Sequence, residues 1–470
     1  MKLTAAEFAA IAPLLALTVG ALVVLVLDVL AGALVPIAGA AAFLAALALA
    51  AARWGETGAT AFDGLFVADG LTLAAGGIAT VAALLSWWGT RRTFEPAREK
   101  RGEFLALHLL APVGMFLLAG ARHALVLVLG IETLSVAFYV LAAFDRGRLE
   151  SVEAGLKYFL LGSLAAAVLL YGGALLFGAS GSFSLDLPPG SSPMRTAAAC
   201  LLLAGLLFKM SAAPFHFWTP DVYEGAPTGV VGFFAAGTKA AALAALLRWT
   251  AILPEPQTLL TAAALLTLLV GNGAALVQDR VKRLLAYSAI AHGGVLLLGA
   301  AAAASGGAEA VRAAVFYLVA YAPMTVGAFA LLGLLEAESG PLTLQSLRGL
   351  GRRRPLVAAG LAFFLVSLGG LPPTGGFFAK LFVFGAAVRA GLVLPTVAAV
   401  LLSLVGFAAY LRVVGAALLS TPPERAPAPA ARPRLGSVLV AGVCAAAVFV
   451  LGILPDGTLE ALAALPAVGR

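Results

Sequence analysis

The sequence predicts an all-α polytopic membrane protein with about fourteen transmembrane helices. Of its 470 residues, 62% are hydrophobic and only 11% are charged, whereas soluble domains are roughly 45–50% apolar and about 25% charged. Apolar runs long enough to cross roughly 30 Å of hydrocarbon recur along the whole chain. The basic residues between these runs fall mainly in every second loop. The three observations agree on the fold class.

The predicted spans follow one another with short connections. They cover residues 8–30, 33–52, 71–89, 104–120, 124–144, 152–177, 196–218, 229–250, 258–277, 284–304, 310–336, 356–390, 393–419 and 435–455. The first run is too long for the apolar core of a cleavable signal, so we expect it to stay in the membrane. Cys200 and Cys444 both lie in apolar runs, and two cysteines are too few for a disulfide framework or a thiolate metal site.

The positions of lysine and arginine predict the orientation of the chain. Loops after the third, fifth, ninth, eleventh and thirteenth spans hold 17 of the 30 basic residues, and the opposite side, both termini included, holds eight. The positive-inside rule therefore places the cation-rich loops in the cytoplasm and both termini outside. The net charge of +7 is spread over many short loops, so it does not indicate nucleic-acid binding.

Ionisable side chains also lie within the predicted spans. They are Glu132, Lys157, Lys209, Lys239, Lys380 and Arg412. An ionisable group at the bilayer centre costs roughly 2.5–3.5 kcal/mol on insertion scales. Burial of Glu132, Lys209, Lys239 and Lys380 together therefore costs on the order of 10 kcal/mol. Such a cost requires partners, water or a function.

Prolines interrupt two of the predicted spans. In the seventh, Pro214 cannot donate a hydrogen bond to the carbonyl of Met210. In the twelfth, the sequence SLGGLPPTGGFFAK contains two prolines, and Pro373 leaves the carbonyl of Gly369 without its helical donor. Backbone groups left free at membrane depth are tolerated only where they are buried in protein or line a hydrated cavity.

Each predicted break has a lysine nearby, on opposite sides of the break. Lys209 comes five residues before Pro214, and Lys380 comes seven residues after Pro373. Interrupted helices that lie five spans apart and run in opposite directions indicate inverted-topology repeats with ion sites near the bilayer midplane. We therefore expect two inverted five-helix repeats in a chain of four parts: an N-terminal three-helix segment, the two repeats and a segment with the last helix, at 1–103, 104–250, 251–420 and 421–470.

Five stretches of the fifth to twelfth spans resemble a known family. They are GIETLSVAFYVLAAF, EAGLKYFLLGSLAAAVLLYG, FKMSAAPFHFWTPDVYEGAPT, QDRVKRLLAYSAIAHGG and GLPPTGGFFAKLFVF. They resemble the antiporter-like membrane subunits of respiratory complex I, the proton-translocating NADH:quinone oxidoreductase. Within that family, Lys380 fits the subunit N and subunit L branches rather than the M branch, which has glutamate there. The long C-terminal lateral helix of the L branch has no counterpart in the sequence, which favours the N branch.

The resemblance implies a proton path through buried ionisable residues. The path would run laterally from Lys209 through Lys239 to Lys380, with Glu132 paired to Lys209. His292 is a plausible bridge on the tenth span, although a lone histidine on a buried helix is equally often a packing residue.

The polar residues around the first break can be interpreted in more than one way. Lys157 resembles a family lysine, but Glu153 one turn earlier also fits an ordinary i,i+4 ion pair. His216, Asp221 and Glu224 follow the break, where we expect them to cap the freed backbone groups, with admission of water as the alternative.

The resemblance places the redox chemistry elsewhere. The sequence contains no flavin, nicotinamide or iron–sulfur motif, so FMN and iron–sulfur clusters are expected in partner subunits, and quinone is expected to be reached only through the complex. The expected location is the bacterial inner membrane. One alternative is a subunit of a multi-subunit sodium/proton antiporter, which shares the same plan. Another is a structural scaffold, which would explain Glu132 and Lys209 but not Lys239 and Lys380.

Overall fold

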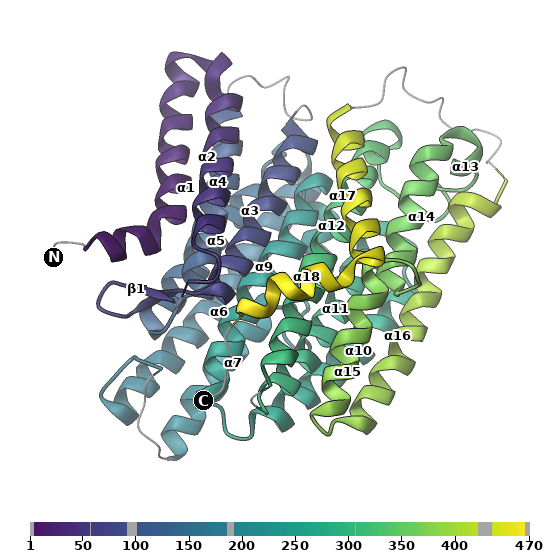
Figure 1. The fold of residues 1–470 in the computed structure, drawn as a ribbon. Helices are drawn as coiled ribbons and strands as arrows, with labels where there is room; N and C mark the ends of the chain where they lie inside the picture. The colour runs from purple at the N-terminus through teal and green to yellow at the C-terminus, as the bar shows by residue number, and fades with distance from the viewer. Residues whose placement is uncertain are drawn as a thin grey trace.

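Long helices that lie roughly side by side make up most of the molecule (Figure 1). The computed structural model describes residues 4–56, 58–91, 101–185, 192–305, 307–421 and 435–465. The cation-rich loops predicted at 91–101 and 421–434 lie almost entirely outside the described residues.

The elements follow in chain order. The helices of the first half are α1 Ala5–Leu30, α2 Val35–Ala52, α3 Gly70–Thr90, α4 Arg101–Ala119, α5 Ala124–Ala142, α6 Leu149–Ser180, α7 Pro193–Lys209, α8 Thr219–Gly225 and α9 Thr228–Trp249. Those of the second half are α10 Pro256–Leu276, α11 Val281–Ala303, α12 Ala308–Ser339, α13 Leu350–Arg353, α14 Pro355–Gly369, α15 Gly375–Arg389, α16 Val393–Val414, α17 Leu435–Ile453 and α18 Pro455–Ala461. Two short strands, β1 Ala59–Ala61 and β2 Phe66–Ala68, form an antiparallel hairpin before α3.

The helices account for about fourteen membrane crossings. Twelve helices in the described part of the chain are long and apolar enough to span a bilayer. Two further crossings are interrupted: α7 is followed by the short helix α8, and α14 is followed by α15. The prediction of an all-α membrane protein with two broken spans is therefore confirmed.

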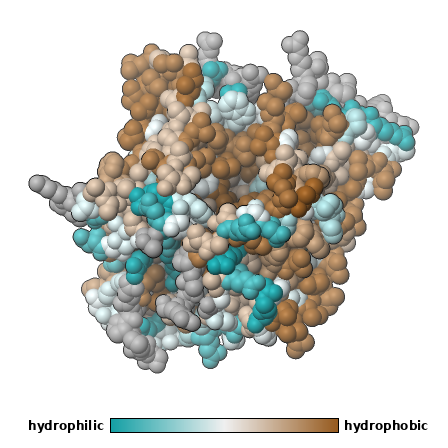
Figure 2. All heavy atoms as spheres, in the orientation of Figure 1, coloured by the Kyte–Doolittle hydropathy of each residue, from teal (hydrophilic) through white to brown (hydrophobic). Residues whose placement is uncertain are grey.

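The central helices differ from the outer ones in burial. Nearly every residue of α9 and α11 is buried, as are 22 of the 32 residues of α12, whereas the outer helices expose apolar side chains such as Val29 of α1 and Leu394 of α16. Figure 2 shows apolar side chains over the upper ends of α1 and α2 and polar ones gathered across the middle near α18. The apolar exterior suits contact with lipid or with apolar surfaces of other subunits.

Glycines allow close packing of α4 against α5. A Cβ on Gly114 would lie 2.4 Å from the backbone nitrogen of Leu134, and one on Gly130 would lie 2.5 Å from that of Leu118. Small residues at helix contacts are typical of membrane proteins, because the attraction there comes from close backbone packing rather than from the hydrophobic effect. The pair fixes the half of α5 that carries Glu132.

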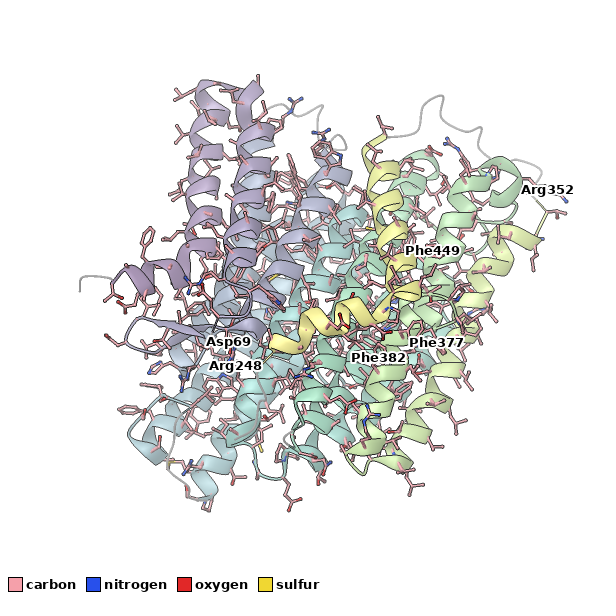
Figure 3. All side chains as sticks on the ribbon, in the orientation of Figure 1. Asp69, Arg248, Arg352, Phe377, Phe382 and Phe449 are labelled. Atoms are coloured by element: carbon pink, nitrogen blue, oxygen red, sulfur yellow. The ribbon has the colours of Figure 1, made fainter. Side chains whose placement is uncertain are left out.

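An ion pair anchors the N-terminal part of the chain to α9. Asp69 accepts a hydrogen bond from the Thr72 backbone as the N-cap of α3, and its carboxylate also binds Arg248 near the end of α9. Arg248 donates a second hydrogen bond, of 2.6 Å, to the carbonyl of Ala119. Figure 3 shows Asp69 and Arg248 close together, far from Arg352 at the upper right.

Two charged residues lie differently from the sequence interpretation. Lys282 is counted with the loop cations in the sequence, but α11 begins at Val281 and the Lys282 side chain is buried. Arg412 lies in the last turn of α16, where it binds Asp279 and the backbone carbonyls of Leu276 and Gln278, at the end of α10 and in the loop after it. Arg412 therefore ties helix ends together.

Candidate functional site

The break in the seventh crossing begins directly after Lys209. Helix α7 ends at this residue, the chain is non-helical up to Trp218, and α8 starts at Thr219 with Pro220 in its first turn. The sequence predicts a span over 196–218 that is interrupted at Pro214, whereas the helix already ends at Lys209, five residues before that proline. The last helical residue of α7 is thus itself a buried lysine.

Lys209 is held by a hydroxyl and surrounded by aromatic rings. Its Nζ donates a hydrogen bond of 2.6 Å to Ser135 Oγ on α5. The same nitrogen lies 5.8 Å from the ring centre of Tyr139 and 5.5 Å from that of Tyr158. Ring faces attract a cation and hydroxyls accept from it, so this pocket tolerates a charged lysine without a carboxylate in contact.

The direct Glu132–Lys209 pair expected from the family resemblance is not formed in this structure. The described contacts include no hydrogen bond or ion pair between the two side chains, and Glu132 Oε1 is buried without a hydrogen-bond partner. Ser135 lies one turn along α5 from Glu132 and takes the position of direct partner to Lys209. Residue spacing could not distinguish these two contacts, because both side chains lie on one helix a turn apart.

Lys239 lies at the centre of α9 and is fully buried. Its Nζ has no hydrogen-bond partner among the described residues. A Cβ on Gly293 of α11 would lie 3.7 Å from Lys239 Cε and 3.0 Å from the carbonyl oxygen of Met210. That carbonyl is the one that Pro214 leaves without its helical donor, so Lys239 lies close to the break after α7.

His292 of α11 lies between two phenolic hydroxyls. Its Nδ1 is 2.5 Å from Tyr317 Oη, and its Nε2 is 3.1 Å from Tyr410 Oη. Tyr410 also contacts the hydroxyl of Ser288. The ring of Tyr321 packs 4.9 Å from the His292 ring and lies 6.0 Å from Lys239 Nζ. His292 therefore belongs to a polar chain beside Lys239 rather than to an apolar packing site.

Lys380 uses a backbone group released by the second break. Its Nζ donates a hydrogen bond of 2.9 Å to the carbonyl of Gly369 at the end of α14. This is the carbonyl that Pro373 was predicted to leave free. A cavity of about 10 Å³, lined by Lys380, His292, Tyr410, Asn272 and Ser403 among others, has room for roughly one water molecule.

Lys157 lies outside this buried line. It forms ion pairs of 2.7 Å with Glu153 and 3.0 Å with Asp221, and its side chain is 42% exposed. Asp221 also binds Arg283 at 2.6 Å, so this network ties α8 to α6 and α11.

The predicted capping roles after the first break are not what the structure gives. Asp221 binds cationic side chains, and Glu224 pairs with Arg280 at 3.4 Å. His216 Nδ1 is buried without a hydrogen-bond partner among the described residues.

Four functional candidates are missed by the sequence interpretation. Ser135 and Tyr410 make the contacts described above, and they give no sequence signal because buried hydroxyls are common in membrane helices. Lys282 and Glu336 form a buried pair at 3.3 Å between α11 and α12. Both lie at predicted span ends, where charge is ordinary. If the tenth span were predicted to begin at Val281, where α11 begins, Lys282 would be recognised as an ionisable residue within a membrane helix.

The polar side chains form one line through the middle of the molecule. In order it contains Lys209, Lys239, His292 and Lys380, with phenols and broken backbone between them. Within the described residues no group of three His, Cys, Asp or Glu side chains could hold a metal ion. The arrangement suits proton movement between bases of exchangeable charge through hydroxyls and water.

Proteins of known sequence are similar to this chain over most of its length. Residues 121–406 match the family described as NADH:quinone oxidoreductase/Mrp antiporter, TM. NADH-quinone oxidoreductase subunit 14 of Thermus thermophilus is 46% identical over 388 residues, which cover 83% of this chain and 86% of the relative. NADH-quinone oxidoreductase subunit N 1 of Symbiobacterium thermophilum is 38% identical over 485 residues, with 97% and 98% coverage.

Solved structures share the whole fold. A chain of respiratory complex I from Thermus thermophilus with bound aureothin matches with a TM-score of 0.83 and 39% identity, covering 97% of this chain and 100% of that one. A chain of the Mrp complex from Dietzia sp. DQ12-45-1b has a TM-score of 0.85 but 22% identity, with 97% and 96% coverage, and supports the fold alone. On the family match and the extent of these identities, the chain belongs to the NADH:quinone oxidoreductase/Mrp antiporter transmembrane family.

Proposed function

We propose that the chain is a proton-translocating membrane subunit of an NADH:quinone oxidoreductase, of the subunit N type. Relatives of 38–44% identity are named NADH-quinone oxidoreductase subunit N, and the relative of 46% identity is named NADH-quinone oxidoreductase subunit 14. Lys209, Lys239 and Lys380 would hold the translocated protons in turn. His292 would connect the second and third lysines, and Glu132 would bias the first. Lys157 would support the path from the cation-rich side by holding α8.

Lys239 provides the observation on which the proposal rests. A lysine buried for structural reasons is expected to have an acid or a set of acceptors around it. Lys239 has none among the described residues, yet it lies beside a broken backbone and a histidine. A static scaffold gives no reason to bury such a group, whereas a relay needs a site that can gain and lose a proton.

The remaining features follow from membership of such a complex. We propose the two repeats at 104–250 and 251–420, flanked by 1–103 and 421–470. The chain would be a non-redox part of the translocase, with FMN and iron–sulfur clusters in partner subunits and quinone reduced elsewhere. It would lie in the bacterial inner membrane with both termini outside. Copurification with flavin and iron–sulfur subunits supports this assignment, and purification with polytopic subunits alone contradicts it.

Replacement of Lys239 tests the proposal. Lys239→Met and Lys239→Arg should both assemble and both lose most proton pumping in sealed vesicles, since neither side chain can lose a proton in the cycle. Thr238→Val is a matched control, because the Thr238 hydroxyl is already bound to the Phe234 carbonyl of its own helix at 2.6 Å. Normal pumping by Lys239→Met would remove Lys239 from the path.

The same vesicle assay distinguishes the proposed function from that of a sodium/proton antiporter subunit. A sodium/proton antiporter requires sodium for proton movement and needs no NADH, whereas the proposed subunit requires NADH and quinone and works without sodium. Pumping measured with and without sodium, and with and without NADH, distinguishes the two.

A further inference from the structure

A buried asparagine of α10 lines the small cavity beside Lys380. The Asn272 residue is only 6% exposed, and its amide nitrogen Nδ2 has no hydrogen-bond partner among the described residues. Buried polar groups are nearly always hydrogen-bonded to protein or to water. An asparagine buried for helix packing alone is expected to bond to another protein group, so the Nδ2 atom points to a ligand in the cavity.

Close helix packing fixes the direction of the Asn272 side chain. A Cβ on Gly271 would lie 2.6 Å from the backbone nitrogen of Ala291, so α10 and α11 approach closely at this level. A Cβ on Gly406 of α16 would overlap the amide oxygen of Asn272. Gly406 is not among the residues that line the cavity. The amide oxygen is therefore directed at the backbone of α16, which leaves the amide nitrogen as the polar atom for the cavity.

The cavity is small enough for its lining groups to share one water molecule. Its volume is about 10 Å³, which is about the space that one water molecule needs. The side chains of Ser403 and Tyr410, two turns apart on one face of α16, line it together with those of Lys380 from α15 and His292 from α11. A water molecule there is close to polar groups from four helices.

These groups supply the hydrogen bonds that a buried water molecule requires. Such a molecule typically makes about three. The Asn272 amide and the Lys380 ammonium group can donate to its oxygen, and the Ser403 and Tyr410 hydroxyls can accept from it. His292 needs no direct contact with the water, because its Nε2 lies 3.1 Å from Tyr410 Oη. The Tyr410 hydroxyl thus connects the histidine to the cavity.

We propose that Asn272 is a positioning residue of the relay, and that its amide holds one water molecule between Tyr410 and Lys380. A proton on His292 Nε2 passes to the Tyr410 hydroxyl, which gives its own proton to the water, and the water gives a proton to the neutral amine of Lys380. The hydroxyl and the water are unchanged after the transfer, His292 has lost one proton and Lys380 has gained it. This role rests on the proposed function and adds a residue of α10 to it.

A matched pair of substitutions separates water binding from packing. Asn272→Val and Asn272→Thr have nearly the same shape, but only the threonine carries a hydroxyl that can bind the water. In the assembled complex, Asn272→Val should slow NADH-driven proton pumping severalfold, and Asn272→Thr should recover much of the lost rate at the same complex yield. Equal pumping by the two variants at equal yield would assign Asn272 to packing and overturn the proposal.

Two further variants complete the assay. Thr396→Val is the control, because the buried Thr396 hydroxyl of α16 is bound to the Leu392 carbonyl at 2.6 Å and does not line the cavity. Pumping by Asn272→Val at the rate of Thr396→Val would overturn the role of Asn272. If Lys239→Met is inactive in the same assay, that result leaves the proposed function intact, whereas normal pumping by Lys239→Met would remove the relay itself.

Direct observation of the water tests the proposal independently of pumping. A cryo-electron microscopy map of the assembled complex that resolves water should show one molecule within hydrogen-bond distance of Asn272 Nδ2 and Tyr410 Oη. The same map of Asn272→Val should lack it. A dry cavity in the wild-type complex, or an unchanged water in Asn272→Val, would overturn the proposal whatever the pumping rates.

Discussion

Three buried lysines occupy three different chemical settings. Lys209 donates to a serine hydroxyl, Lys380 donates to a backbone carbonyl, and Lys239 has no partner among the described residues. None of them contacts a carboxylate within ion-pair distance in the described part of the chain. A lysine in a tight buried ion pair is fixed as a cation, so the settings found here leave each charge more easily exchanged.

At the residue scale, the missing direct contact changes what is expected of Glu132 and Lys209. Because no ion pair is broken, we expect Glu132→Gln and Lys209→Met each to assemble in near-normal yield. Both should impair pumping, Lys209→Met more strongly, and the double variant should resemble Lys209→Met. Complex yield and proton pumping should be measured for the wild type, the two single variants and the double variant. Full recovery of pumping in the double variant would indicate that Glu132 and Lys209 have only a structural role.

Ser135 gives a second prediction at this scale. Ser135→Ala removes the one hydrogen-bond acceptor that Lys209 Nζ has among the described residues. Loss of a hydrogen bond to a charged group costs about 1.5–3 kcal/mol, so pumping should fall roughly tenfold or more at neutral pH. Ser135→Thr retains the hydroxyl and should retain most activity. The rate of pumping in sealed vesicles compares the two, and equal rates would show that the Ser135 contact is dispensable.

At the element scale, backbone chemistry was predictable and side-chain contacts were not. Pro214 and Pro373 indicate both broken spans, and the Gly369 carbonyl freed by Pro373 does receive a donor. The sequence misplaces the start of the first break and the start of α11, because helix ends depend on tertiary contacts. Lys282 appears as a loop residue for the same reason. Its partner Glu336 lies 54 positions away, a separation that no local pattern reports.

The buried Lys282–Glu336 pair joins α11 to α12. Lys282→Met removes one partner of the Glu336 carboxylate, which is part-buried and keeps Thr228 and Arg148 beside it, so the cost should stay below the value of about 3–5 kcal/mol for breaking a fully buried pair. The yield and thermal stability of the complex should therefore fall. In the double variant Lys282→Met with Glu336→Gln the charge left beside this position is Arg148, whose side chain is 35% exposed and can be hydrated, so much of the stability should return. A double variant less stable than the single one would contradict this role.

The Asp69–Arg248 pair connects α3 to α9 and gives a pH dependence. Burial alone would raise the pKa of Asp69, but Arg248 and the Thr72 hydrogen bonds outweigh it and hold that pKa below the ordinary value of 3.8. Because the pKa of Asp69 is lower in the folded protein, the ionised carboxylate stabilises the folded state. This stabilisation is complete when the pH is above the ordinary pKa of Asp69, and it is lost as the pH falls through the pKa of Asp69 in the folded protein. Wild-type protein should therefore exceed Asp69→Asn in thermal stability at pH 7, and the difference should shrink below pH ~4. A difference independent of pH would assign the effect to the N-cap hydrogen bond alone.

At the scale of the whole molecule, the most deeply buried of the described spans are those that carry the central machinery. α9, α11 and α12 hold Lys239, His292 and Tyr321, and the outer helices shield them from lipid. Composition and loop charge predict the number of crossings, because bilayer thickness and backbone hydrogen bonding leave few other solutions. They do not predict which helices lie at the centre, since apolar sequences serve equally for lipid contact and for protein contact.

The orientation of the chain is the last prediction, and it depends on the parity of the loops. Gly147 lies between α5 and α6 with Arg146 and Arg148 on either side, and Gly307 lies between α11 and α12, five crossings later and therefore on the opposite side. Both are exposed and have room for a side chain. The positive-inside rule places the first in the cytoplasm and the second outside. In a background without Cys200 and Cys444, a membrane-impermeant maleimide should label Gly307→Cys in intact cells and Gly147→Cys only in inverted vesicles. Labelling after solubilisation in detergent controls for cover by neighbouring subunits, and the reverse pattern would place both termini in the cytoplasm.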